Sequence, residues 1–476
     1  MIDINKIITP ERKYADIISD LKKKSVVIPA WSDLEKLYIP KQHRIITDKS
    51  LRPKPKIKDG QREIPAKVTY AAEMITTNRM TQMAFSIPVK RIYKTDKDKT
   101  KKEQAAAMEA IYKHARIDGV NMNRWKAYFA CCEVMTIWYT VEEENKLYGF
   151  DSKFKLKCRS YSPMPQKTSK ITQASLYPII DEYEDMIAMS FEYVVDNNGV
   201  KSTYFETYTK TAHYKWVTEG TKETDVVIDG EVIKIKKHPL FYAWRPAPIY
   251  EDISDDRDEI EFTLSRTSDI IRRNSAPIVK LIGKTIGETP VGDRAREVYQ
   301  MELGGDVDTV SPSISPESAK YYVSTLKQNM EEYTQLPNLS LENIKSISAI
   351  SGEARKTLLT DAHLKVGEEK HDIIYALDRE CNIIKAFLGE MNTAWKESIK
   401  DLSVEHVITP FIQNDEVAEI DKTMKATGGK AVMAQKTAIS MLGMVEDPEA
   451  EMLLIKAEED ADAERTRKTD VFTNAE

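Results

Sequence analysis

The sequence predicts an α+β protein whose copies associate into a ring. Residues 136–249 are rich in β-branched and aromatic residues separated by turn signals, a pattern typical of antiparallel strands. Helical periodicity prevails before and after this region, and the longest helix, expected over 352–400, would span ~70 Å. The helices expected over 250–274 and 315–335 carry apolar faces that one chain cannot bury, which favours closed head-to-tail rings.

The composition limits the class of protein. With 476 residues, the chain is long enough for about three structural units. Hydrophobic residues make up 41% and charged residues 31%, which excludes a polytopic membrane protein and wholesale disorder. The 70 Lys and Arg and 76 Asp and Glu give a net charge of −6, which excludes an evenly basic DNA-coating protein. No signal peptide is visible and no run approaches ~20 apolar residues, so we expect no membrane-spanning helix.

The first part of the chain is expected to begin outside the core. Residues 1–62 are mixed and charge-rich, and are predicted to form an arm or extended loop. A helix is expected over 67–85, and it ends before Pro88 because the residue ahead of a proline is disfavoured in the helical region. Two further helices are expected over 103–115 and 121–134.

Two turns are predicted inside the β-rich region. Asn198-Gly199 supplies the two positive-φ positions of a tight hairpin turn. Asp229-Gly230 marks a second turn by its composition.

The helix expected over 250–274 is amphipathic and polarised in charge. Acidic residues occupy its first half and arginines its second, which suits the helix dipole. The acidic face between Asp252 and Glu261 is interpreted as solvated or as facing an interface. Residues 278–312 contain several glycines and short apolar runs, and are predicted to form a small compact α/β insertion. The apolar seam of the helix consists of Ile253, Ile260, Leu264 and Ile271.

A second helix returns over 315–335, with Ser315 as its N-cap and Pro316 at its first position. A polar loop then leads into the long helix, which Gly367 and Gly389 could bend. The apolar seam of the long helix consists of Leu377, Cys381, Ile384, Leu388, Met391 and Trp395.

The C-terminal part is expected to be a strand followed by short helices. The strand is predicted over 404–412, and the first helix over 414–425. Thr437 caps a second helix. Asp447 caps a third, which is expected to fade into an acidic tail at 458–460.

The sequence shows no catalytic or metal-binding pattern, so no cofactor is expected. It has no G-x-x-x-x-G-K-[ST] phosphate loop, no HExxH, no GxSxG and no zinc-ligand spacing. His363 and His371 lie on roughly one face of the long helix, but no carboxylate or cysteine completes a ligand set. No CxxC pair exists, and the cysteines are expected to be buried reduced thiols. They are Cys131, Cys132, Cys158 and Cys381.

Four basic residues occur in the insertion between the two amphipathic helices. In a single copy, ordinary surface charge is the plain interpretation. Repeated around a ring, they would make a collar that faces a polyanion. These residues are Lys280, Lys284, Arg294 and Arg296.

The order of these elements resembles that of the portal proteins of tailed double-stranded DNA bacteriophages, of the siphophage type. Residues 351–356 (SGEARK) resemble the S-G-x-A-x-[KR] start of that family's long helix. Residues 407–415 (VITPFIQND) resemble its F-T-P-x-I-P-x-N-D strand, and residues 436–451 (KTAISMLGMVEDPEAE) its x-T-A-[IL]-S-x-L-x-x-V-x-D-P-E-x-E segment. Ser86 replaces the family's usual glycine and Gln413 a common proline, which affects local turns only.

The resemblance implies a ring, usually of twelve subunits, with a portal fold. That fold has a β-rich and helical wing, a helical-hairpin stem, a small α/β clip, a long kinked helix and a helical crown. The implied regions are an N-terminal arm (1–62), the first part of the wing (63–250), a stem helix (251–276), the clip (277–314), a returning stem helix (315–335), a tunnel loop (336–351), the long wing helix and strand (352–413), and the crown with the C-terminal tail (414–476).

The resemblance also implies a role in the virion. The ring would occupy one vertex of the capsid, after assembly in the host cytoplasm, and genomic DNA would be packaged and ejected through its channel. The expected partners are other copies of the chain, double-stranded DNA, the major capsid protein, the scaffolding protein, the terminase large subunit and a head-completion or adaptor protein, with no membrane. Because the packaging ATPase lies on the terminase, a chain without a phosphate loop fits this role.

In that topology, the polar loop lies at the narrowest point of the channel. Small polar groups and a single base can touch phosphate without a large affinity from counterion release. The plain alternative is a solvent-exposed loop, since loops mostly lie on surfaces. The residues expected to face DNA are Asn338, Ser340, Asn343, Lys345, Ser346 and Ser348.

Two other function classes remain open at this point. A head-assembly or minor capsid protein without a channel would not need a polar loop between two long helices. An enzyme, such as a nuclease or a phosphotransferase, would need a metal-binding carboxylate set or a phosphate loop, and the sequence shows neither.

Overall fold

The computed structural model of the chain combines helices and sheets, in agreement with the predicted mixed class. It divides into two compact units, one formed by Met1–Pro337 and Asp361–Phe411 and the other by Asn338–Thr360 and Ile412–Glu476. The described residues are 4–9, 11–53, 64–95, 98–165, 173–197, 200–219, 222–274, 278–282, 285–289, 298–301, 303–304, 306–310, 316–338, 359–411, 416–428, 432–442, 445 and 448–473.

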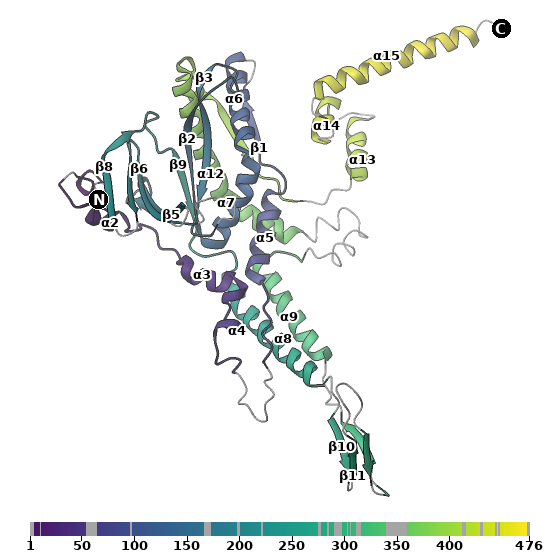
Figure 1. The fold of residues 1–476 in the computed structure, drawn as a ribbon. Helices are drawn as coiled ribbons and strands as arrows, with labels where there is room; N and C mark the ends of the chain where they lie inside the picture. Colours follow the sequence, from purple (N-terminus) through teal and green to yellow (C-terminus); the bar gives the residue numbers. More distant parts are fainter. Residues whose placement is uncertain are drawn as a thin grey trace. The chain divides into compact units, whose positions relative to one another are not determined.

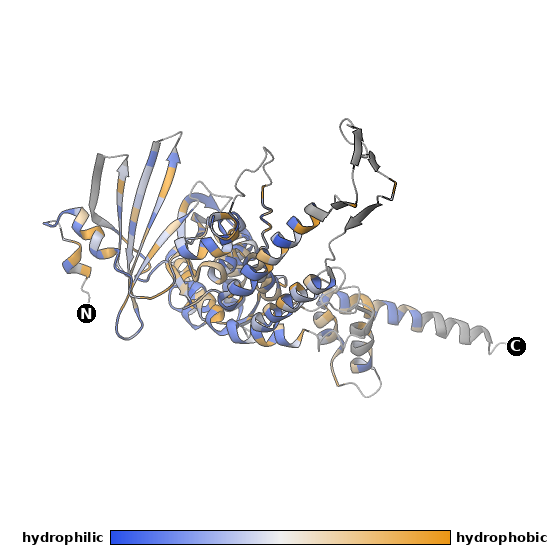
Figure 2. Cartoon of the chain, turned by 90° about the horizontal axis from the view of Figure 1, so that it is seen from below, coloured by the Kyte–Doolittle hydropathy of each residue, from blue (hydrophilic) through white to orange (hydrophobic). Residues whose placement is uncertain are grey.

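The larger sheet of the first unit is an antiparallel meander of five strands in chain order (Figure 1). Hydrophobic and hydrophilic residues are interspersed along these strands in Figure 2, as expected for a sheet with two different environments on its faces. Apolar residues of this sheet pack with Met135, Ile137 and Leu240 of a neighbouring sheet. The strands are β4 (Ala174–Ile180), β5 (Met186–Asn197), β6 (Val200–Thr209), β7 (Ala212–Glu219) and β8 (Lys222–Val232).

The two predicted turns have different outcomes. The pairing of β5 with β6 runs to Asn197↔Val200, which confirms the predicted hairpin. The turn predicted at Asp229-Gly230 is wrong, because β8 runs through both residues. A Cβ atom on Gly230 would lie 2.8 Å from Cε1 of Tyr214, so this glycine serves a close contact with β7 rather than a turn.

A second sheet of three strands packs against helices of the same unit. Its order is β3–β2–β9, with β2 (Glu133–Asn145) between β3 (Ser152–Tyr161) and β9 (Leu240–Trp244). A third, two-stranded sheet pairs β1 (Lys90–Lys94) with β14 (Ser403–Val407). β14 begins one residue before the strand predicted over 404–412 and ends five residues before the predicted end. The helices are α5 (Ala72–Phe85), α6 (Lys99–Ala115), α7 (Ile117–Cys131) and α12 (Thr360–Met391).

Helix boundaries differ from the predicted ones where side chains or backbone geometry intervene. α6 begins four residues earlier than expected because the Asp98 side chain accepts hydrogen bonds from the N–H groups of Thr100 and Lys101. α7 ends at Cys131 rather than at residue 134, because Cys132 has a left-handed backbone (φ 66°) and β2 begins directly after it.

The long helix is shorter than the sequence predicts. α12 has 32 residues, or about 48 Å, and ends at Met391 instead of residue 400. Asn392 leaves the helical conformation, and its side chain caps a short 3-10 turn, Thr393–Trp395. A Cβ atom on Gly389 would lie 3.3 Å from Cα of Lys396, so glycine permits the chain to fold back there. The seam residues from Cys381 onward still pack in one core, with Met108, Trp138 and Leu156.

The described N-terminal segment is part of the first unit and packs on its five-stranded sheet, so the prediction of an arm or loop outside the core is wrong for it. Ile17 and Leu21 pack with Phe205 and Trp216 of the five-stranded sheet, because the amphipathic second helix has an apolar face that this sheet covers. The short helices are α1 (Ile4–Ile7), α2 (Tyr14–Leu21), α3 (Trp31–Tyr38), η1 (Pro40–Gln42) and α4 (Arg44–Thr47).

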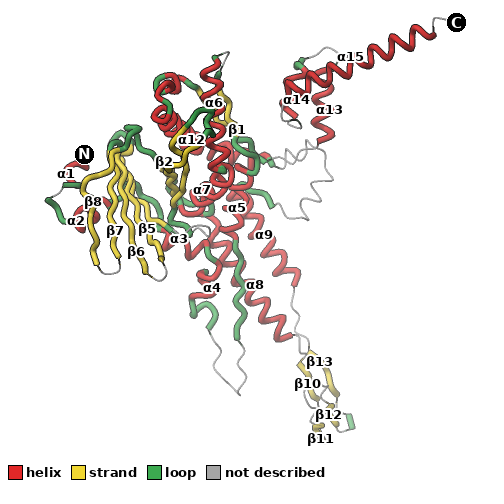
Figure 3. Tube along the Cα trace, turned by 45° about the horizontal axis from the view of Figure 1, so that its top comes forward, coloured by secondary structure: helices red, strands yellow, loops and turns green. Residues whose placement is uncertain are grey.

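The two amphipathic helices predicted in the middle of the chain are confirmed. They are α8 (Ser254–Asn274), which a 3-10 turn η2 (Glu251–Ile253) precedes, and α9 (Pro316–Thr334). They pack against each other as a hairpin (Figure 3). The described residues between them form four strands and a turn at 303–304. The helical part of the predicted α/β insertion stays a prediction for the remaining residues. These strands are β10 (Ile278–Ile282), β11 (Thr285–Thr289), β12 (Val298–Met301) and β13 (Asp306–Val310).

The second unit is helical in its described part. It contains α13 (Glu416–Thr427), α14 (Gln435–Leu442) and α15 (Pro448–Thr473), and Lys436 forms an ion pair with Glu449. The expected fading of the last helix at 458–460 is wrong, since α15 continues to Thr473. Its acidic stretch is interrupted by alanines, which have the highest helix propensity, and appears blue in Figure 2.

Candidate functional site

Most residues that the sequence assigns to the DNA path lie outside the described residues. Asn338 is described four residues after the end of α9, and Lys280 is described in the backbone of β10. Their assigned roles stay predictions. The residues outside the described ranges are Ser340, Asn343, Lys345, Ser346 and Ser348 of the predicted tunnel loop, and Lys284, Arg294 and Arg296 of the predicted collar.

The strand pairing around Lys280 bears on the predicted basic collar. β10 pairs antiparallel with β13, and Lys280 lies opposite Asp308. Residues directly opposite each other in an antiparallel pair share one face. A ring of Lys280 positions would therefore carry an equal number of acidic positions on the same strand face.

The α8/α9 hairpin is only partly buried within one chain. Of the predicted seam of α8, Ile253 and Ile260 are fully buried, whereas Ile271 is 58% exposed. On α9, Tyr321 is 75% exposed and Tyr333 57% exposed. The described part of the chain thus leaves large apolar and aromatic side chains on these two packed helices exposed.

A buried ionic cluster joins α8 to earlier parts of the chain. Arg257 Nε donates to Glu73 Oε1 (2.9 Å), and Arg257 Nη1 lies 2.8 Å from Asp258 Oδ1 and 3.8 Å from Glu261 Oε2. The side chains of Arg257 and Glu261 are 1% and 0% exposed. The prediction of a solvated acidic face is therefore wrong for Glu261, because α4 and α5 pack against α8.

His43 completes this cluster from the N-terminal segment. Its Nδ1 lies 2.6 Å from Glu261 Oε1, and its Nε2 lies 2.8 Å from the carbonyl oxygen of Leu37. A carbonyl oxygen can only accept, so Nε2 carries a proton and donates it. The contact of Nδ1 with the carboxylate ties α8 to the turn between η1 and α4.

An extended segment, residues 64–70, lies along α8 (Figure 3). The N–H groups of Ala66, Val68 and Tyr70 donate to Asp269 (2.8 Å), Ser265 (2.9 Å) and Glu261 (2.7 Å), respectively. The donors are two residues apart on the extended segment, a distance of ~6.6 Å, and the acceptors are four residues apart on the helix, a distance of ~6.0 Å. Because these distances are nearly equal, three successive contacts can form. These bonds explain why α5 begins at Ala72 and not at residue 67 as predicted.

The Glu73 carboxyl gives the cluster a pH dependence. Burial raises the pKa of Glu73 from 4.5 to about 7, although the nearby Arg257 guanidinium opposes this rise. A carboxyl with a raised folded-state pKa contributes stability that is complete below its unfolded pKa and is lost as pH rises through the folded pKa. Stability should therefore fall between about pH 4.5 and 7.

We expect Glu73→Gln to reduce this fall with pH, so that the free energy of unfolding decreases by on the order of 1–3 kcal/mol less than in the wild type. Urea unfolding followed by circular dichroism at pH 5, 6, 7 and 8 measures the effect. Glu405→Gln, on an exposed strand position, is the matched control and should keep the wild-type slope. Equal slopes for the two variants would show that Glu73 does not cause the dependence.

A second buried ion pair joins α7 to α12. Arg124 donates through Nη1 and Nη2 to the two carboxylate oxygens of Glu380, both at 2.7 Å, and Trp138 Nε1 donates to Glu380 Oε1 at 2.9 Å. The Arg124 guanidinium also lies 5.0 Å from the ring centre of Phe241. The sequence analysis missed this pair. In the sequence, Arg124 stands next to Trp125 and Glu380 stands next to Cys381. A charged residue beside a residue of a commonly buried type is the one local signal, and it does not identify the charged partner.

The described residues offer little for metal or thiol chemistry. No group of three His, Cys, Asp or Glu side chains among them could hold a metal ion. Cys131, Cys132 and Cys381 are buried, as predicted, and Cys158 is half-buried; all four are free thiols. Burial raises the pKa of Cys381 to about 11, which keeps this thiol protonated. None of the described helices is both long and apolar enough to span a membrane.

Comparison with known proteins adds one finding. The model of a family described as phage portal protein, SPP1 Gp6-like, matches residues 28–465. This range includes both compact units and all but the ends of the chain. No curated protein matches the sequence.

Proposed function

The chain belongs to the family of SPP1 Gp6-like phage portal proteins, and on that premise we propose that its copies form a closed ring whose channel passes the phage genome during packaging and ejection. Portal proteins are structural components of the phage. The ring, of about twelve subunits by the family resemblance, would occupy one vertex of the virion capsid after assembly in the host cytoplasm.

The observation that carries the proposal is the incompletely covered α8/α9 hairpin. Ile271, Tyr321 and Tyr333 are exposed, whereas Ile260 of α8 and Leu326 and Met330 of α9 are buried. The same hairpin of a neighbouring subunit can cover these side chains. One face of each hairpin would then contact a different face of the next subunit's hairpin. Such a head-to-tail contact produces a closed ring when the rotation from one subunit to the next adds up to a full turn.

The charge of the chain supports passage of DNA rather than tight binding. A net charge of −6 limits the number of phosphate contacts that release counterions. The predicted tunnel loop at 336–351 has one base, Lys345, among small polar residues. Such a lining would guide DNA and let it slide.

The strands between α8 and α9 support a docking role at the clip. β10 pairs only with β13, and β11 only with β12, among the described strands. A two-stranded sheet is at best marginally stable alone, so we expect neighbouring subunits or a partner to complete these sheets. The terminase large subunit and a head-completion or adaptor protein are the proposed partners there, and the major capsid and scaffolding proteins are proposed partners of the assembled ring.

An averaged electron-microscopy view along the axis tests the proposed function. We expect rotational symmetry and a central hole. Tyr321→Asp should convert rings to smaller species at the same concentration, because it places a charge in the subunit contact. Tyr183→Asp is the matched control, since Tyr183 is 74% exposed and Tyr321 75%, and it should leave the rings intact. A closed particle without a hole would favour a minor capsid role, and a monomer at all salt concentrations would refute the ring.

Lys345→Glu tests the DNA path. The substitution changes the charge by two units per subunit at the proposed constriction, so we expect normal rings that package or retain less full-length DNA. Lys153→Glu makes the same change at an exposed position of β3 and should behave as the wild type. Packaging and retention equal to the wild type at low and high salt would show that Lys345 does not face DNA.

A further inference from the structure

One edge of β2 is open over half of its length. β2 pairs with β3 as far as Asn145↔Ser152, but with β9 only as far as Ile137↔Leu240. Trp138 N–H then donates to the carbonyl oxygen of Pro239 (2.8 Å), and no described strand pairs with this edge beyond it. The main-chain groups of alternate residues face the same edge, so those of Thr140 and Glu142 face the open one.

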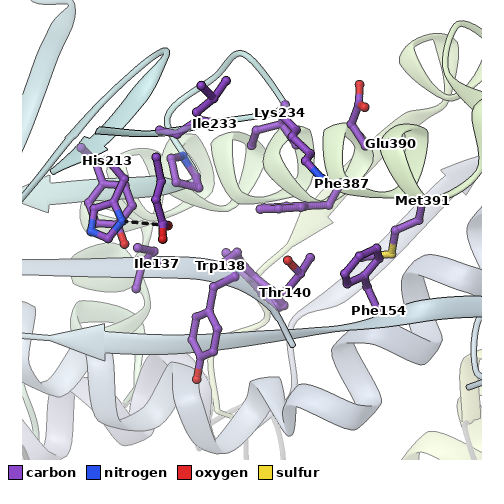
Figure 4. A pocket seen from close by; sticks show the side chains of 16 residues that line it. Ile137, Trp138, Thr140, Phe154, His213, Ile233, Lys234, Phe387, Glu390 and Met391 are labelled. Atoms are coloured by element: carbon purple, nitrogen blue, oxygen red, sulfur yellow. Dashed lines mark ion pairs between the residues drawn. The ribbon is translucent and has the colours of Figure 1, made fainter. Parts of the chain in front are cut away.

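A cavity of about 370 Å³ adjoins this edge (Figure 4). Phe387 and Met391 of α12 line it from one side, and Thr140 and Phe154 of the three-stranded sheet from the other. Its volume is within the range of pockets that accept ligands or side chains, ~300 Å³ and above. A hollow with apolar side chains on two of its sides thus lies beside the main-chain groups of β2 that no described strand pairs with.

Acidic side chains outnumber basic ones around the open edge, since Glu231 and Glu390 line the cavity together with one lysine, Lys234. Glu142, Glu143 and Glu144 follow one another on β2, and Glu142 is exposed at the open edge. Glu143 pairs with Lys155 across the sheet (2.8 Å). At the rim of the cavity, the side chain of Glu231 is 85% exposed, and its oxygen lies 3.7 Å from His213 Nδ1.

We propose that this edge binds an extended, basic segment of a partner protein. The segment would add a strand to β2 through main-chain hydrogen bonds with Thr140 and Glu142. It would place an apolar side chain in the cavity and a lysine or arginine near Glu142 or Glu231. This is strand addition, in which the main chain supplies affinity and alternate side chains supply specificity. Charge disfavours the same edge of a second copy as the occupant, because the two acidic stretches would repel each other.

A synthetic peptide tests this directly with the full-length protein. The probe is acetyl-KVKLKVK-amide with a fluorescein label, and fluorescence anisotropy reports its binding at low and high salt. We expect saturable binding that weakens as salt rises. Methylating the peptide nitrogens that face β2 should weaken binding by about tenfold or more, because each loses a main-chain donor. The same peptide with glutamate in place of lysine should not bind.

Protein variants locate the peptide on the open edge. Thr140→Pro removes an N–H that faces this edge and leaves the bonds to β3 in place, so binding should weaken about tenfold. Glu142→Lys should weaken binding of the lysine peptide about fivefold at low salt and less at high salt. Glu405→Lys, at an exposed position of another sheet, is the matched control and should bind as the wild type.

Several results would overturn the proposal. One is the absence of binding at peptide concentrations on the order of millimolar. Another is that the N-methylated peptide binds as tightly as the unmodified peptide, a comparison that uses only the wild-type protein. A photo-cross-linking amino acid at Thr140 that joins two copies in the purified assembly would identify a neighbouring subunit as the occupant instead.

Discussion

Arg124→Met is expected to destabilise the protein by about 3–5 kcal/mol, because it leaves the Glu380 carboxylate buried without its partner. Both side chains are at most 1% exposed, so water cannot replace the lost guanidinium without opening the contact between α7 and α12. Urea unfolding at constant protein concentration measures the loss, since assembly makes apparent stability depend on concentration.

The double variant Arg124→Met/Glu380→Leu separates the value of the pair from the cost of breaking it. Replacing a buried ion pair by apolar side chains of similar size is often neutral or stabilising. We therefore expect the double variant to recover most of the loss, apart from about 1 kcal/mol for Trp138 Nε1, which loses its acceptor. Arg379→Met, on α12 next to Glu380 but only half-buried, should stay within about 0.5 kcal/mol of the wild type. A double variant no more stable than Arg124→Met would show that packing, and not charge, causes the loss.

Removal of residues 285–301 is expected to abolish DNA packaging while the rest of the fold and the ring persist. These residues contain β11 and β12, which pair with each other and with no other described strand. The β10–β13 pairing, from Ile278↔Val310 to Ile282↔Asp306, stays available to close the shortened loop. Packaging of phage DNA by the variant in place of the wild-type protein measures the effect.

Replacing an exposed segment elsewhere gives the control for this deletion. The connection at 182–184 between β4 and β5 is short, exposed and remote in sequence from α8 and α9. Replacing Glu182, Tyr183 and Glu184 by glycines should leave packaging intact. Normal packaging by the 285–301 deletion would refute the docking role proposed for these strands, and loss of rings would instead assign them to subunit contacts.

Local signals in the sequence determined much of the fold. Pro316 and the helical periodicity after it are enough to place α9, and the Asn198-Gly199 pair is enough to set the β5–β6 register. Both depend on residues close together in the chain, where backbone sterics and turn geometry decide the outcome. The family resemblance, drawn from short motifs and from their order, is confirmed by the match over residues 28–465.

Contacts between residues distant in the sequence decided the rest. Residues 67–71 can form a helix by propensity, but the N–H groups of Val68 and Tyr70 bond to side chains nearly two hundred residues later, on α8. Glu261 belongs to an acidic run that suggests solvent, but it is fully buried, and its Oε1 lies 2.7 Å from Tyr70 N and 2.6 Å from His43 Nδ1. The free energy of burying a charge depends on its partner, and only the tertiary structure brings that partner within hydrogen-bonding distance.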